Sequence, residues 1–194
     1  MTRLLVLRHG PTEWNAQRRI QGHADIPLSE AGRAAVAQWR LPGWAAGWDV
    51  LASPLARALE TARLLGLDPV PEPALTELDW GEWEGLRLSD KTRIDPAELA
   101  EREALGVDFR APGGESYREV QDRLAPLLLR RAATGRDTVA VCHRGVILAL
   151  YAWAAGWTMI SDAPDGLQWG CGHLFRLEGT GAPVIDRLNI SLAA

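Results

Sequence analysis

Cysteine is scarce in this chain of 194 residues, which contains only Cys142 and Cys171. Two cysteines cannot build a disulfide framework, so we expect two buried thiols and a cytoplasmic location. A cysteine nucleophile for phosphoryl transfer would need an arginine six positions further on, but Leu148 and Leu177 stand there. That mechanism is therefore excluded.

Long apolar runs and an excess of positive charge are also missing. No apolar stretch reaches the length of a transmembrane helix, and the first three residues lead directly into the first expected strand, without room for a signal peptide. The formal net charge is −4. We therefore expect neither a nucleic-acid nor a membrane partner, because both would require a basic surface.

Lysine is almost absent, since Lys91 is the only one among 21 basic residues and the others are arginines. Genomic composition explains most of these arginines. At a binding site an arginine still matters, because its planar fork holds phosphate oxygens with two hydrogen bonds. The chain has no Gly-Lys-Ser/Thr phosphate loop and no aspartates two positions apart. Any phosphate chemistry must therefore use other groups.

The remaining pattern alternates apolar strands with helices. Ser53 is a credible N-cap for the second helix, Pro54 suits its first position and Gly66 ends it. The order of elements predicts an α/β fold, namely a three-layer α/β/α sandwich around a central, mostly parallel sheet, in a single domain of residues 1–194. Strands are expected at 4–7, 49–52, 138–142, 172–177 and 184–192, and helices at 29–40, 54–65, 115–133 and 146–155.

A histidine follows the first strand, in the sequence Leu7-Arg8-His9-Gly10. A second one, His143, follows strand 138–142, and Arg57 lies in the first turn of a helix, where free amides and the helix dipole favour an anion. Because the carboxyl ends of parallel strands meet at one edge of a sheet, we expect these side chains to converge. His173 lies inside a strand and is interpreted as structural. His23 lies in a loop and has no strong claim to catalysis.

Four motifs in this order carry a resemblance to a known family. With them the chain resembles the histidine phosphatase superfamily, which includes cofactor-dependent phosphoglycerate mutases and broad phosphatases. The likeness spans nearly the whole chain. The motifs are Leu7-Arg8-His9-Gly10 with Thr12-Glu13-Trp14-Asn15, then Ser53-Pro54-Leu55-Ala56-Arg57-Ala58, then the segment 75–85 with Glu77, Trp80, Glu82, Trp83 and Glu84, and finally Val141-Cys142-His143-Arg144-Gly145.

The resemblance implies that His9 attacks phosphorus to form a phosphohistidine, which water then hydrolyses. Neutral imidazole suits this role, since its reference pKa is about 6.5. Arg8, Arg57 and His143 would surround the phosphoryl oxygens, and this pocket would replace the metal that other phosphatases use, so we expect neither a metal nor a cofactor. The implied substrate-binding set comprises Arg8, Asn15 as an amide donor, Gln21, Gly22, Arg57, Glu77, His143 and Arg144.

The resemblance also implies a glutamate that protonates the leaving group, and alignment of the third motif assigns Glu77 to this role. Such an acid must be neutral when substrate binds, so its pKa should be raised by burial. Glu82 and Glu84 are the competing carboxylates, and the alternative for both is a charged loop.

Several alternatives stay open. Many relatives have glycine where Arg144 stands; facing the pocket, Arg144 would favour a second anionic group or narrow the entrance, and facing solvent it would do neither. Trp14, Trp80, Trp83 and Trp169 could stack on a substrate ring or simply fill the core.

The function itself also has alternatives. We expect a metal-independent phosphomonoesterase for a small phosphorylated metabolite, either broad or specific for α-ribazole phosphate. The alternatives are phosphoglycerate mutase-type transfer and a catalytically silent module that binds a phosphorylated ligand. Exposed tryptophan-containing edges could support a homodimer.

Overall fold

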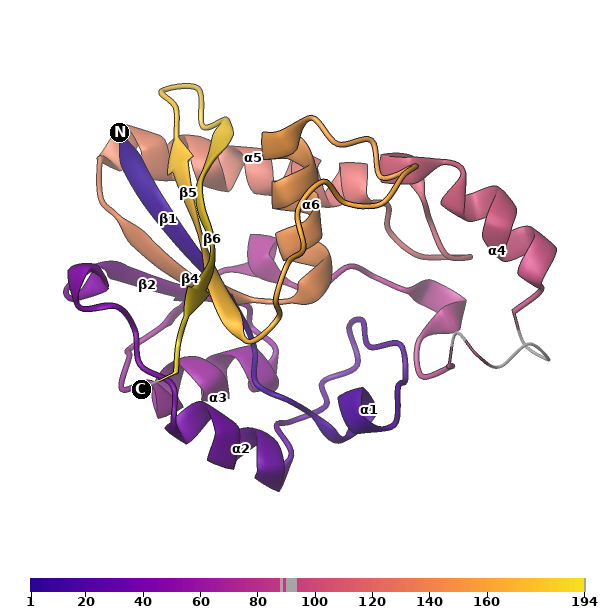
Figure 1. Ribbon diagram of the computed structural model, residues 1–194, viewed down its shortest axis with the longest axis horizontal. Coiled ribbons are helices and arrows are strands. Elements are labelled where there is room, and N and C mark those ends of the chain that lie inside the picture. Colours follow the sequence, from indigo (N-terminus) through magenta and orange to yellow (C-terminus); the bar gives the residue numbers. More distant parts are fainter. Residues whose placement is uncertain (88, 90–93, 194) are drawn as a thin grey trace.

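A single six-stranded sheet forms the centre of the protein (Figure 1). The computed structural model describes residues 1–87, 89 and 94–193. The strands lie in the order β3-β2-β4-β1-β5-β6, in which the first four are mutually parallel and β5 and β6 pair antiparallel. The α/β fold is confirmed, with a mixed sheet. Its strands are β1 (Thr2–Arg8), β2 (Asp49–Ala52), β3 (Val70–Pro71), β4 (Thr138–Cys142), β5 (Cys171–Leu177) and β6 (Pro183–Ser191).

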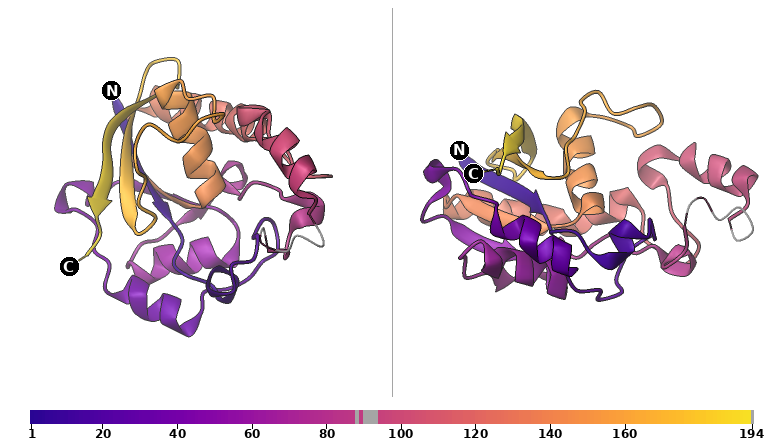
Figure 2. Two further views of the ribbon diagram at one scale, coloured as in Figure 1. Left: turned by 45° about the vertical axis from the view of Figure 1, so that its right-hand side comes forward. Right: turned by 60° about the horizontal axis from the view of Figure 1, so that its bottom comes forward.

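Helices cover both faces of this sheet. In Figures 1 and 2, α2 and α3 lie on one face and α5 and α6 on the other, which gives three layers. The α-helices are α1 (Glu13–Ala16), α2 (Glu30–Ala37), α3 (Ala56–Leu64), α4 (Pro96–Glu103), α5 (Tyr117–Thr134) and α6 (Arg144–Ala155). Short 3-10 turns are η1 (Gly43–Ala45), η2 (Pro73–Leu75), η3 (Gly81–Trp83) and η4 (Gly106–Asp108).

The apolar run of β1 is buried on both sides because side chains alternate along a strand. Leu4 and Val6 belong to the larger core cluster, with residues of α5 and α6. Leu5 and Leu7 belong to the second cluster, with residues of α3. The strand is therefore anchored between both helical layers, and Arg8 at its end has a fixed position.

Helix ends follow local signals in α2 and α5. Ser29 caps α2 by accepting a hydrogen bond from the amide of Gly32, and α2 ends at Ala37, three residues before the predicted end. Ser116 and Glu119 form a capping box at the start of α5, which runs through Pro126 to a left-handed Gly135.

The predicted start of α3 is wrong. Ser53 is fully buried and its amide bonds to Val141 O at 2.9 Å, so it continues the sheet instead of opening the helix. Leu55 occupies the N-cap position without a side-chain cap, and Ala56 N is bound by Asp25 Oδ1 at 2.7 Å from a distant loop. Arg57 is nonetheless in the first turn, as predicted.

Outside the sheet, η3 and α4 lie to one side of the strands, with α4 farther away (Figures 1 and 2). Of the two thiols, Cys142 is buried, but Cys171 at the start of β5 is only half-buried, which corrects the expectation of two buried thiols. Across residues 1–87, 89 and 94–193, no helix combines the length and the apolar character needed to cross a bilayer.

Candidate active site

The two histidines lie side by side at the carboxyl ends of neighbouring parallel strands. Arg8 at the end of β1 is in register with Cys142 at the end of β4, and the amide of His9 donates to Cys142 O at 2.9 Å. His143 follows Cys142 directly, and the centroids of the two imidazole rings are 5.1 Å apart. Strand register therefore brings together residues 134 positions apart in the sequence.

His9 is held as a neutral imidazole with one free nitrogen. Its Nδ1 lies 2.6 Å from the carbonyl oxygen of Gly10. Because a carbonyl oxygen only accepts, Nδ1 carries the proton and Nε2 keeps its lone pair. Burial, reinforced by the charges of Arg8 and Arg57, lowers the pKa of His9 well below 6.5. A neutral imidazole with a free Nε2 has the chemistry that a nucleophile needs at neutral pH.

His143 has the complementary tautomer. Arg57 Nε donates to His143 Nδ1 at 3.3 Å, so the proton of His143 lies on Nε2. This Nε2 is buried and has no partner among the described residues. Burial, reinforced by the charges of nearby arginines such as Arg57 and Arg8, lowers the pKa of His143 well below 6.5. A neutral, unpartnered N–H donor therefore stands beside His9.

Arg57 is fully buried and its guanidinium is fixed by backbone carbonyls. Nη1 donates to Ala24 O and Nη2 to Gly22 O, both at 2.8 Å. Burial lowers the pKa of Arg57 to about 10, although Glu77 and other carboxylates oppose this shift. The arginine is still protonated at neutral pH. The predicted Gly22 thus contributes its carbonyl to Arg57.

Gln21 and Asn15 are organised around Thr12. The side-chain amide of Gln21 lies 2.9 Å from Thr12 Oγ1 and 3.2 Å from Nη1 and Nε of Arg57, and all partners are satisfied when Gln21 donates to Thr12 and accepts from Arg57. Asn15 Oδ1 accepts from the amide of Thr12 at 3.0 Å in the capping box of α1. This leaves the amide nitrogen of Asn15 as a donor at the pocket that it lines.

Glu77 is a buried carboxyl in the same pocket. Its Oε1 accepts from the amides of Leu78 and Gly145, each at 2.9 Å, which leaves Oε2 to carry a proton. Burial raises the pKa of Glu77, although these amides and the charges of Arg57 and Arg8 oppose the shift. Such a carboxyl can act as a general acid.

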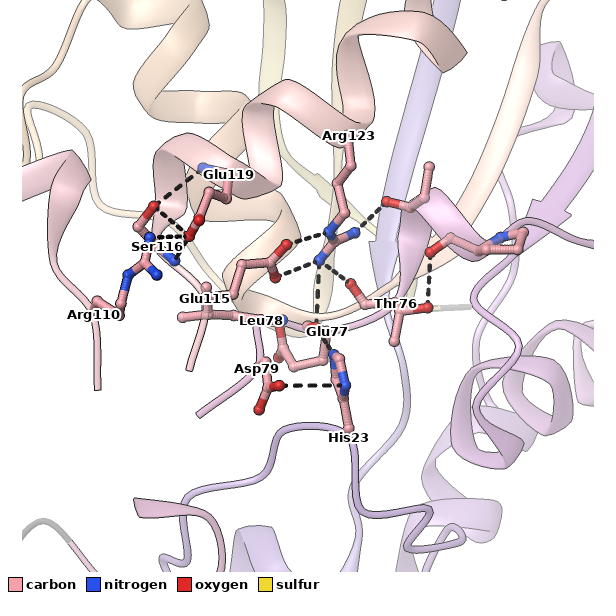
Figure 3. A network of polar contacts seen from close by, with 12 residues as sticks. His23, Thr76, Glu77, Leu78, Asp79, Arg110, Glu115, Ser116, Glu119 and Arg123 are labelled. Atoms are coloured by element: carbon pink, nitrogen blue, oxygen red, sulfur yellow. Dashed lines mark hydrogen bonds and ion pairs between the residues drawn. The ribbon is translucent and has the colours of Figure 1, made fainter. Parts of the chain in front are cut away.

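A polar network fixes the backbone around Glu77 (Figure 3). Arg123 of α5 donates to Ala74 O, to Thr76 O at 2.6 Å and to Glu77 O at 3.3 Å, and it pairs with Glu115 at 2.8 Å. His23 Nε2 lies 2.9 Å from Glu77 O on the other side. Glu77 is therefore held by two elements that are distant from it in the sequence.

The competing carboxylates have other surroundings. Glu82 is exposed. Glu84 accepts from the amides of His23 and Ala24, both at 2.7 Å, and so closes the loop that holds Arg57. Neither lines the pocket described here.

The pocket has a volume of about 580 Å³. Three of the predicted site residues are buried and do not line the pocket, namely Arg57, His143 and Gly22. His143 lies beside His9, and Gly22 belongs to the loop of residues 22–24 that holds Arg57. The predicted residues that line it are Arg8, His9, Asn15, Gln21, Glu77 and Arg144.

The chain that carries this arrangement is similar to a known protein family. Residues 4–188 match the family model described as the histidine phosphatase superfamily (branch 1). The chain belongs to this superfamily. The matched range includes the residues that the structure brings together, namely Arg8, His9, Arg57, Glu77 and His143.

Individual relatives carry several activities in their names. A glucosyl-3-phosphoglycerate phosphatase of Mycolicibacterium vanbaalenii is 38% identical over 79% of this chain and 74% of its own. A 2,3-bisphosphoglycerate-dependent phosphoglycerate mutase of Methylobacterium radiotolerans is 34% identical over 97% of this chain and 91% of its own. The bifunctional protein Rv2228c of Mycobacterium tuberculosis is 36% identical over 99% of this chain, which spans only 50% of that relative.

Among solved structures, mycobacterial glucosyl-3-phosphoglycerate phosphatase Rv2419c in complex with VO3 superposes with a TM-score of 0.79 at 27% identity, covering 100% of both chains. The likeness to the superfamily fold thus extends over the whole of the three layers.

The superfamily motifs did not indicate every residue at this pocket. Tyr117, at the start of α5, was not predicted, and burial, with the charge of Glu77, raises its pKa to about 12. Trp80 lines the pocket as one expected alternative, whereas Trp83 belongs to the core and Trp14 packs on Gly85. The other lining residues that sequence reasoning missed are Arg18, Arg19, Ile20, Ser89 and Gly145.

Proposed function

We propose that this protein is a metal-independent phosphomonoesterase that hydrolyses small phosphorylated metabolites through a phosphohistidine on His9. The observation that carries the proposal is the pairing of a neutral His9, with a free Nε2, and a buried Glu77 of raised pKa in one pocket. A binding module would need neither a nucleophile nor an acid.

In the first step, His9 Nε2 attacks phosphorus while the bond from phosphorus to the ester oxygen breaks. Glu77 gives its proton to the departing oxygen. In the second step, water attacks the phosphohistidine, Glu77 takes a proton from that water, and the bond to Nε2 breaks to release phosphate. The enzyme then returns to its starting protonation state.

Fixed charges and donors supply the electrostatic stabilisation. Arg8 and Arg57 carry positive charge, and the unpartnered Nε2–H of His143 is a further donor for a phosphoryl oxygen. Groups that are already oriented need no reorganisation during the reaction, which is why they stabilise charge strongly. We propose that they replace a metal ion, so chelation should leave the rate unchanged.

The proposal is tested by hydrolysis of p-nitrophenyl phosphate from about pH 5 to 8 with EDTA present. Wild type should turn over, and His9→Ala should lose activity while its circular dichroism spectrum stays that of a folded protein. Substantial residual activity in His9→Ala would remove His9 as nucleophile, and a strong loss with EDTA would overturn the metal-free mechanism.

Glu77 is tested by the leaving group. Glu77→Gln should slow alkyl phosphates far more than p-nitrophenyl phosphate, whose leaving group needs little protonation. Glu82→Gln is the matched control, because Glu82 is an exposed carboxylate of the same loop region and should behave as wild type. Equal slowing of both esters by Glu77→Gln would instead indicate a structural role.

Phosphoglycerate mutase-type transfer is the second candidate, supported by the Methylobacterium relative that matches 97% of this chain. The two activities differ in the fate of the phosphoryl group. Incubation with 3-phosphoglycerate should release inorganic phosphate from a phosphatase, whereas a mutase would form 2-phosphoglycerate and retain a long-lived phosphoenzyme. A folded protein that binds phosphate but does neither would be a silent binding module.

A further inference from the structure

Arg144 faces the pocket, which decides between the two orientations considered for it. It lines the same cavity as His9 and Glu77, and it is exposed to solvent within it. Its guanidinium carbon lies 4.9 Å from the centroid of the Trp169 ring. The Arg8 guanidinium carbon lies 5.9 Å from the centroid of the same ring, so one indole orients two cations at one end of the pocket.

The position of Arg144 is unfavourable for the fold. It is the first residue of α6, where the helix dipole carries partial positive charge and disfavours a cation. The contact that orients it within the described residues is the indole of Trp169 rather than a carboxylate. Burial, opposed by Glu77 and reinforced by Arg144, lowers the pKa of Arg8, so the two arginines also repel each other. A cation at a helix start, beside a second arginine and with an indole in place of a carboxylate partner, points to a role in function.

The phosphoryl group already has its own partners. Arg8, Arg57 and His143 lie around His9, and Asn15 lines the pocket as an amide donor. Arg144 adds a further planar fork that can hold a carboxylate or phosphate with two hydrogen bonds. An anion bound there would relieve the repulsion between the neighbouring arginines.

We propose that Arg144, oriented by Trp169, binds a second anionic group of the substrate, a carboxylate or a second phosphate close to the phosphoester. This rests on the proposed phosphomonoesterase function. Closeness follows from the sequence, because Arg144 is adjacent to His143 and consecutive Cα atoms are about 3.8 Å apart. Substrates with a single phosphate and a neutral remainder are then the poorer class.

The test compares 3-phosphoglycerate with glycerol 3-phosphate, which carries a hydroxymethyl group in place of the carboxylate. In Arg144→Gln, the ratio of kcat/KM for the two substrates should fall about tenfold to hundredfold, the worth of a hydrogen bond to a charged group. Arg187→Gln is the matched control. It removes the same charge from an exposed site on β6, outside the pocket, and should keep the ratio within about twofold.

Trp169→Leu should lower the same ratio by a smaller factor, because Arg144 keeps its charge but loses the ring that orients it. An unchanged ratio in Arg144→Gln would overturn the proposal. Faster turnover of both substrates would also overturn it and show that Arg144 narrows the entrance.

Failure of the proposed function has a different signature, since wild type would then hydrolyse neither substrate nor p-nitrophenyl phosphate. In that case the affinities of both compounds are measured by calorimetry. Arg144→Gln must lower the preference for 3-phosphoglycerate by the same factor, and an unchanged preference would refute the role of Arg144.

Discussion

Gly145→Ala should disable the proposed proton donor, Glu77, without replacing that residue. The amide of Gly145 donates to Glu77 Oε1 at 2.9 Å, so the helix backbone and the carboxyl are in direct contact. A Cβ on Gly145 would lie 2.5 Å from Glu77 Oε1 and 2.8 Å from Leu78 Cβ. Ordinary contacts begin near 3.4 Å, so the carboxyl must move by about 1 Å.

The expected loss follows from that displacement. A misplacement of 1 Å at a reacting group costs about a hundredfold in rate, or about 2.7 kcal/mol of barrier. The free energy of unfolding should change less than the activation barrier. Overpacking destabilises the fold by about 1–3 kcal/mol, while alanine in place of glycine within a helix stabilises it by about 1 kcal/mol. The variant should therefore fold, with a Tm lowered by a few degrees at about 2–4 °C per kcal/mol.

The assay is kcat for glycerol 3-phosphate and for p-nitrophenyl phosphate. Gly145→Ala should lose about a hundredfold on the alkyl ester and much less on the aryl ester, whose leaving group needs little protonation. Adding the change to Glu77→Gln should cost little more, because both variants remove the same proton transfer. Gly166→Ala is the control, since a Cβ there meets nothing within 4 Å. Wild-type turnover of the alkyl ester by Gly145→Ala, or fully multiplicative losses in the double variant, would refute the reasoning.

Three further predictions concern the same groups. The pH profile for an alkyl ester should have an alkaline limb set by the raised pKa of Glu77, and this limb should vanish in Glu77→Gln; its persistence would assign it elsewhere. Arg123→Met should lower kcat for alkyl esters about tenfold and shift that alkaline limb, because the backbone at Glu77 loses the hydrogen bonds from Arg123. Arg130→Met is the control, since Arg130 lies on the same helix and is largely exposed, and it should do neither. The free energy of unfolding should fall as pH drops below about 6.5, because His9 and His143 stay neutral in the folded state while unfolded histidines take up protons. Denaturant titrations at pH 7 and 5.5 on wild type and His143→Gln would detect this. An equal change of unfolding free energy with pH in both proteins would contradict it.

Much of this fold was predictable because its two central strands, β1 and β4, contain continuous apolar runs buried on both faces. The strand 138–142 and the end of β1 before His9 were located in this way, and their register then brought His9 beside His143. His173 is fully buried within β5 and does not line the pocket, which agrees with its interpretation as structural. A motif at a strand end thus carries information about a site because parallel strands share an edge.

The predicted start of α3 failed for a reason that lies outside the local sequence. Serine is a residue type typical of an N-cap, but the amide of Ser53 donates to Val141 O of β4. Asp25, from a loop about thirty residues earlier, then binds the amide of Ala56. Because the residue that caps the helix is distant in sequence, the local sequence could not predict the first residue of α3.

Glu77 shows the same limit at the active site. The family motif indicated which glutamate to choose, but its raised pKa depends on burial in the folded chain, and its backbone position depends on Arg123 and His23. Its carboxyl accepts from the amide of Gly145 in α6. Arg123 from α5 and His23 from an N-terminal loop meet at its backbone only in the folded chain (Figure 3). The motif thus singled out Glu77 as the proposed acid, whereas its protonation depends on contacts that only tertiary structure provides.

The surroundings of Arg57 explain how one rigid framework can serve both histidines. Three of its N–H groups donate to the carbonyls of Gly22 and Ala24 and to His143 Nδ1, and these contacts hold the guanidinium in one orientation. That immobility fixes the tautomer of His143 and places a constant positive charge whose repulsion helps to keep His9 neutral. The same residue therefore helps to keep Nε2 of His9 unprotonated and Nε2 of His143 protonated. Both states exist before any substrate arrives, so little reorganisation is left for the transition state.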